Sequence, residues 1–209
     1  MAQYLKLFKT EADYEAVVGT ENEPTVSHIV EDVEVVIKEP EWVDLGLPSG
    51  TLWRKCNIGA TKETEVGNYY QYGKGSRTYQ ETSGETTYQG TEKPLAASAD
   101  TAIQVLGGEW HMPTAAQCEE LTANTTIEYN VYVDGVKCIK LTAPNGNFLL
   151  FPPTGMYFNG IKQYQGNSVC WTSTLAWTYS QGNFAKSFYA SDMGSTRVDY
   201  GLTVRPVIG

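Results

Sequence analysis

The sequence predicts a loop-rich α+β fold of short β-sheets with one or two helices. Three observations support this prediction. Short apolar runs alternate with turn residues along 209 positions, among which 20 are glycine and 9 are proline. Two dipeptides that favour hairpins, Asp134-Gly135 and Asn145-Gly146, separate alternating apolar runs. Beyond residue 42, helix signals are confined to residues 97–106 and 115–121.

Residues 1–41 are expected to form a small separate element made of a strand, a helix and a β-hairpin. Residues 4–8 alternate like a strand, a short helical segment follows, and residues 25–37 alternate like a hairpin. His28 is expected to be structural, because no second residue of a metal-binding type accompanies it. The charged, proline-containing run Lys38-Glu39-Pro40-Glu41 is typical of a linker between domains.

Residues 42–209 are expected to form the main domain. It begins with two short apolar pieces around the turn Pro48-Ser49-Gly50. Residues 62–96 have almost no aliphatic side chains, and we expect their tyrosines to pack this long loop down, although a second contact surface remains the alternative. Thr114 can cap the helix at 115–121, with Trp110 and Leu121 in the core.

Three strands are predicted next, at residues 127–133, 136–142 and 148–151. The four cysteines (Cys56, Cys118, Cys138 and Cys170) are far apart and lie among apolar residues, which favours buried free thiols, although one disulfide remains open. With two histidines in the chain and no closely spaced cysteine pair, we expect no metal and no cofactor.

The segment from Leu175 to Tyr200 has an unusual composition. It holds six aromatic residues in 26 positions, about twice the 12% of the whole chain, and ten further residues are Ser, Thr, Asn, Gln or Gly. Recognition surfaces of the antibody type use this combination, because rigid rings supply contact area and small polar groups adapt their hydrogen bonds. An aromatic hairpin that packs on its own core is the alternative.

Charge and hydropathy exclude some partners. The formal charge is −9, and the 15 basic residues form no cluster that could neutralise phosphates, so we expect no nucleic-acid partner. No apolar run reaches the length of about 18 residues that a membrane-spanning helix needs, and the first residues lack the pattern of a secretory signal. We therefore expect no membrane insertion. The sequence leaves open whether the chain forms a homo-oligomer.

Three motifs in this order resemble the bacterial major-paralogous-domain family, a branch of the C-type-lectin-like fold. They are VDLGLPSGTLW at 43–53, GGEWHMPT at 107–114 and GLTVRPV at 201–207. The resemblance covers residues 43–209 and implies a C-type-lectin-like fold. Within that branch, a Trp-Thr-Ser-Thr start, an erratic middle and a Val-Arg-Pro-Val end resemble the variable proteins of diversity-generating retroelements, including phage tropism determinants.

That resemblance implies a variable region at about 171–209, in which adenine-directed mutagenesis exchanges surface residues over a fixed framework. Trp177, Lys186 and Met193 cannot be reached from an asparagine codon by such exchange, although Trp177 belongs to the expected surface by its aromatic character. The ligand-binding surface is expected to comprise Trp177, Tyr179, Ser180, Asn183, Ser187, Tyr189, Ser191, Asp192, Ser195, Arg197, Asp199 and Tyr200.

The resemblance implies a receptor-binding protein on a phage particle or a bacterial cell surface, whose partner is a protein or glycan on a bacterial cell. A bacterial adhesin or pilus-tip domain is the alternative carrier. A calcium lectin would need a cluster of oxygen ligands, but Trp171 is followed by Thr172-Ser173. An enzyme of the formylglycine-generating type would need two neighbouring cysteines near the carboxyl end, where Cys170 stands alone, so we expect no catalysis.

Overall fold

Short strands dominate the part of the chain that the computed structural model describes. This part comprises residues 41–76, 78–79, 88, 95–179 and 182–209, except for the side chains of residues 178, 179 and 182. About 40% of the described residues are strand, and two short helices accompany the strands. The prediction of a small, loop-rich α+β fold is therefore confirmed. A division after Glu39 separates the unit described here. The strand, helix and hairpin expected before residue 42, with His28, lie outside the described residues.

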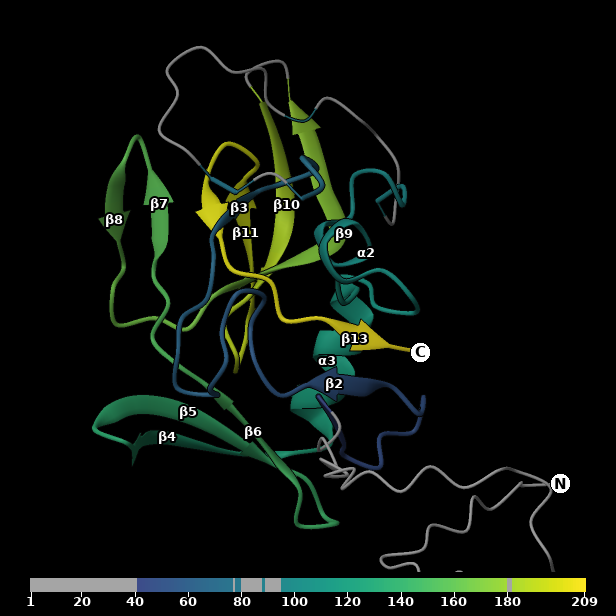
Figure 1. Ribbon diagram of the computed structural model, residues 1–209, viewed down its shortest axis with the longest axis vertical. Helices are drawn as coiled ribbons and strands as arrows, with labels where there is room; N and C mark the ends of the chain where they lie inside the picture. Colours follow the sequence, from purple (N-terminus) through teal and green to yellow (C-terminus); the bar gives the residue numbers. More distant parts are fainter. Residues whose placement is uncertain (1–40, 77, 80–87, 89–94, 180–181) are drawn as a thin grey trace, which may run out of the picture. The chain divides into compact units, whose positions relative to one another are not determined.

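The described strands form four small sheets (Figure 1). One has the order β1-β2-β13, from β1 (Trp42–Asp44), β2 (Leu52–Arg54) and β13 (Val207–Ile208). The second has the order β11-β10-β9, from β9 (Cys170–Tyr179), β10 (Gly182–Phe188) and β11 (Met193–Arg197). The third has the order β3-β12-β7-β8, from β3 (Tyr70–Gln71), β7 (Met156–Phe158), β8 (Ile161–Gln163) and β12 (Gly201–Leu202). The fourth has the order β4-β5-β6, from β4 (Thr126–Val133), β5 (Val136–Thr142) and β6 (Phe148–Phe151).

The three strands of the fourth sheet lie where the sequence predicts them. β4 and β5 are antiparallel and join through the predicted Asp134-Gly135 turn. The sequence did not reveal a β-bulge in β4. Glu128 pairs with Lys140 and Val131 pairs with Cys138, so two residues of β4 stand opposite one residue of β5. Such a bulge bends the strand and turns its side chains in new directions.

Both helices begin at polar caps. α3 (Ala115–Ala123) starts at the predicted Thr114, whose hydroxyl accepts the Gln117 N–H while the Gln117 side chain accepts the Thr114 N–H. Such a reciprocal pair satisfies two backbone donors at once. α2 (Thr101–Leu106) starts at Asp100, later than the predicted residue 97. The carboxylate of Asp100 also accepts the Met112 N–H, so this capping residue joins α2 to the strand-like segment that follows.

Two hydrophobic clusters lie on either side of the base of the β9–β11 sheet. Trp171 and Leu175 on β9 belong to the first cluster, which also contains the buried Tyr70 and Tyr72. The neighbouring Cys170 belongs to the second cluster, with Trp53, Phe188 and the α3 residues Cys118 and Leu121. Successive strand residues point to opposite faces, so one strand supplies both clusters. Trp110, expected in the core, is only partly buried against the first cluster.

A fully buried arginine joins the chain's end to the body of the domain. Arg205 has no exposed surface. Its Nε donates to Asn57 Oδ1 at 2.8 Å, Nη1 donates to the Lys55 carbonyl at 2.7 Å, and Nη2 donates to the Leu150 carbonyl at 2.9 Å. The guanidinium also lies over the Phe151 ring, 4.6 Å from its centroid. Arg205 thus connects the segment after β2, strand β6 and the C-terminal segment.

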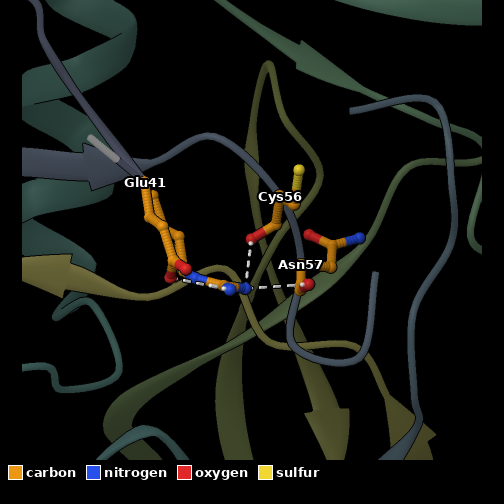
Figure 2. Close-up of polar contacts among 4 residues, drawn as sticks. Glu41, Cys56 and Asn57 are labelled. Carbon is orange, nitrogen blue, oxygen red and sulfur yellow. Dashed lines mark hydrogen bonds and ion pairs between the residues drawn. The ribbon is translucent and has the colours of Figure 1, made fainter. Parts of the chain in front are cut away.

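A second arginine, Arg54, contacts the turn at residues 55–57, which follows β2. Arg54 Nη1 donates to the carbonyl oxygens of Cys56 and Asn57, and Nη2 lies 3.2 Å from the Glu41 carboxylate (Figure 2). The Cys56 sulfur points away from these contacts (Figure 2). Because the turn at residues 55–57 also supplies two acceptors to Arg205, both guanidinium groups fix its backbone.

Candidate binding surface

The β9–β11 sheet presents part of one face to solvent. Phe184 pairs with Trp177 on β9 and with Arg197 on β11, and Lys186 pairs with Ser195. Directly paired residues point to the same side of a sheet, and so do residues two apart on one strand. These five residues therefore share a face, which we call the sheet face: Trp177, Phe184, Lys186, Ser195 and Arg197.

Two aromatic and two cationic side chains lie on the sheet face. The rings of Trp177 and Phe184 lie 5.5 Å apart with an angle of 33° between their planes, and Trp177 remains 40% exposed. Lys186 is half-buried and Arg197 is exposed. An exposed indole on the same face as two cations offers a partner both apolar contact area and positive charge.

Arg197 extends this surface toward β7. Its Nη2 lies 2.6 Å from the Asp199 carboxylate, and its guanidinium lies 5.7 Å from the centroid of the Phe158 ring. The Tyr200 ring stacks on the same Phe158 ring, and the two ring centroids lie 4.5 Å apart. Burial, followed by the nearby Asp199 charge, raises the pKa of Tyr200, so its hydroxyl remains a neutral hydrogen-bond donor at neutral pH.

A second group of predicted residues lies at the turn between β10 and β11. Tyr189 and Ser191 are half-buried and Asp192 is exposed. The Tyr189 N–H donates to the Asp192 carbonyl at 2.8 Å, which closes the turn. All three residues line a cavity of about 500 Å³ whose opposite wall is the β4–β5 hairpin. This hairpin cavity shares no residue with the sheet face.

The structure corrects two of the predicted surface positions. The side chains of Asn183 and Ser187 are 4% and 0% exposed, so neither can contact a partner from its present position. The Ser187 hydroxyl lies 2.9 Å from that of Thr196, and Asn183 Nδ2 donates to the Tyr88 carbonyl. Both residues follow the period of β10, which turns odd-numbered side chains inward together with Ala185. Ser180 and the side chain of Tyr179 lie outside the described residues.

Two residues of the sheet face, Phe184 and Lys186, were not predicted from the sequence, and neither was the hairpin wall of the cavity. Phe184 and Lys186 alternate with the buried Asn183, Ala185 and Ser187, so a period-2 pattern through 183–187 was the available signal. The hairpin wall lies more than forty residues earlier in the chain. Its proximity to the β10–β11 turn depends on tertiary contacts that no local pattern encodes.

The four cysteines are free thiols; Cys118, Cys138 and Cys170 are buried, and Cys56 is half-buried. Burial raises the pKa of each thiol, most strongly for Cys118. Within the described ranges, no three His, Cys, Asp or Glu residues gather as metal ligands would. In the same part of the chain, no helix is long and apolar enough to span a membrane.

Comparisons with known proteins do not add a family to this description. No protein-family model matches the chain, and searches among curated proteins and solved structures find no match either.

Proposed function

We propose that this chain is a binding module that contacts a protein or glycan receptor on a bacterial cell surface through the sheet face. One observation carries the proposal: Trp177, 40% exposed, lies against Phe184 on the same face as Lys186 and Arg197. Tryptophan, tyrosine and arginine are the residues on which binding energy concentrates at protein interfaces. A large aromatic residue held on a regular strand also loses little conformational freedom when it binds.

A rigid body behind the sheet face supports this function. The inward residues of the sheet are buried in the first cluster, and Arg205 ties the C-terminal segment to the β2 turn and to β6. We propose that this body is a C-type-lectin-like domain, on the strength of the three sequence motifs. The outward positions can then change without loss of the fold, because substitutions at exposed sites cost little stability.

We further propose that a diversity-generating retroelement exchanges the outward residues and that the module is displayed on a phage particle. Ser195, Arg197 and Tyr200 are outward or half-exposed residues of types reachable from an asparagine codon. A bacterial adhesin would use the same face on a different carrier. Sequencing the gene's surroundings tests both points: a nearby reverse transcriptase with a template repeat is expected, and a C-terminal segment invariant across isolates would overturn the diversification.

The proposed role is binding and not catalysis. Thiol catalysis requires a thiolate, and burial raises the pKa of both Cys118 and Cys170, so these groups are neutral near pH 7. Incubating the protein with a cysteine-containing peptide, copper and oxygen tests this point. We expect no aldehyde by mass spectrometry, and formation of an aldehyde would refute the binding-only role.

A cell-binding assay tests the sheet face directly. The labelled protein is screened against a panel of gut-bacterial strains, and a strain that binds it is titrated with Trp177→Ala. We expect the affinity to fall about thirtyfold or more, the loss typical of a central aromatic residue. Tyr132→Ala is the matched control, because Tyr132 is an exposed aromatic residue on β4, away from the sheet face. Equal loss in both variants, or none in Trp177→Ala, would refute the proposal.

A further inference from the structure

We propose that the hairpin cavity is a second binding site, whose ligand is a neutral saccharide. The cavity, of about 500 Å³, falls within the range of roughly 300–1,000 Å³ that small-molecule sites occupy. Three segments far apart in sequence form its walls: the β4–β5 hairpin, residues 166–168 and the turn at 189–194. In Figure 1 the β4–β5 hairpin lies at the opposite end of the unit from the arrowhead of β9.

Backbone strain gathers around this cavity. Among the described residues, five non-glycine residues have a positive φ, and two of them, Asp134 and Asn159, precede a glycine in ordinary turns. The other three are Asn130 (φ 60°), Tyr164 (φ 51°) and Ala190 (φ 62°). Asn130 lines the cavity, Ala190 stands between two lining residues, and Tyr164 precedes the lining segment 166–168. Residues in this left-handed region cost stability and concentrate at functional sites.

The strained positions determine how the walls present their side chains. The bulge in β4 places Tyr129 and Asn130 opposite the single residue Ile139, and both of them line the cavity. Across the cavity, the ring of Tyr189 lies against Gly194, where an added Cβ would approach Cε2 to 2.5 Å. The glycine therefore permits this ring position. Two tyrosines, Tyr129 and Tyr189, thus line the cavity from segments far apart in the sequence.

The polar groups of the walls are available to a ligand. Among the residues that the structure describes, the side chains of Asn130, Lys137 and Asn167 make no hydrogen bond within the protein. Asp192 Oδ1 accepts the Met193 N–H at 2.7 Å, and its second oxygen makes no such bond within the same described part. Each amide offers two donors and an acceptor, so the cavity provides many hydrogen-bonding groups of both kinds.

These groups together favour a polyhydroxylated, uncharged ligand. Lys137 and Asp192 contribute one charge of each sign, which gives neither an anion nor a cation a net attraction. A nucleotide or phosphopeptide needs clustered cations, which these walls lack. A pyranose presents an apolar C–H face that can lie on a tyrosine ring, while its hydroxyl groups can bond to amides and to a carboxylate. The inference does not depend on the sheet face, because the two sites have no residue in common.

Saturation-transfer NMR with neutral methyl glycosides of glucose, galactose, mannose and N-acetylglucosamine tests the site. We expect at least one glycoside to receive saturation from the protein, equally well with and without a calcium chelator. Tyr129→Ala and Asn167→Ala should each weaken its affinity about tenfold. Both side chains are exposed, so both variants should fold, which a thermal melt checks.

Three results would overturn the inference: no transfer to any of the four glycosides, unchanged affinity in the Tyr129→Ala and Asn167→Ala double variant, or tighter binding of methyl glucuronide than of methyl glucoside. Trp177→Ala is the control and should bind the glycoside as the natural chain does. Because Trp177→Ala is expected to weaken cell binding about thirtyfold or more and to leave glycoside binding intact, the two proposals can fail separately.

Discussion

Replacing Arg205 by methionine tests how the domain holds its C-terminal segment. Methionine fills a similar volume but donates no hydrogen bond, so the buried acceptors on Asn57, Lys55 and Leu150 lose their donors. Each buried acceptor left without a donor costs about 1–3 kcal/mol. Part of this cost is offset, because the variant no longer buries a charge, and burial lowers the pKa of Arg205, which shows that the charged form is disfavoured there.

The net loss expected for Arg205→Met is about 3–5 kcal/mol, because three acceptors lose their donors at about 1–3 kcal/mol each and the relief of the buried charge offsets part of that sum. For a chain of this length, that loss lowers the melting temperature by roughly 6–20 °C. Arg205→Lys should recover little, because an ammonium group cannot reproduce the planar fork of donors that reaches three separate segments.

Urea unfolding followed by tryptophan fluorescence measures this loss, since Trp53 and Trp171 are fully buried and report on both clusters. Arg197→Met is the matched control. Its ion pair with Asp199 lies at the surface, so its removal should cost less than about 1 kcal/mol. If Arg205→Met unfolds within about 1 kcal/mol of the natural chain, the idea that this arginine joins the C-terminal segment to the body is wrong.

Three further predictions follow from buried or capping groups. Thr114→Ala should lower the free energy of unfolding by about 1 kcal/mol, because α3 loses its cap; an unchanged urea midpoint would contradict this. Burial raises the pKa of Cys118 and Cys170, so above about pH 8.5 the folded chain holds more protons than the unfolded chain. The free energy of unfolding should therefore fall as the pH rises above about 8.5. A constant free energy of unfolding between about pH 8 and 11 would contradict this prediction. Ser187→Arg should lower stability by more than about 3 kcal/mol and Ser195→Arg by less than about 1 kcal/mol, because only Ser187 is fully buried; equal melting temperatures would count against the assignment of the two faces.

Local signals predicted the fold where a single short segment decides the structure. Asp134-Gly135 fixes the β4–β5 hairpin, and Thr114 with Gln117 fixes the start of α3, because turn and cap geometries depend on a few neighbouring residues. The bulge in β4 and the start of α2 at Asp100 were not predicted. Asp100 is selected as a cap partly by its bond to the Met112 N–H, twelve residues away, which a local pattern does not reveal.

The composition of residues 175–200 indicated a binding surface but not which of its residues point outward. Tyrosine and serine suit a surface and a strand interior equally well, so residue type alone could not separate Ser195 from the buried Ser187. Pairing supplies the missing information, since Ser195 stands opposite Lys186 and Ser187 stands opposite Gly194 and the buried Trp171. The hairpin cavity could not be found from sequence, because its walls meet only in the folded chain.

The alternation along β10 constrains any exchange of residues on this surface. Asn183, Ala185 and Ser187 are buried, whereas Phe184 and Lys186 between them are half-exposed. A mechanism that altered every residue of the strand would place charged or bulky side chains in the core at each second position, at a cost comparable with the whole stability of a domain. Exchange compatible with folding is therefore restricted to alternate strand residues and to turns such as 189–192. A surface diversified on this fold must then consist of separate outward positions on a fixed framework.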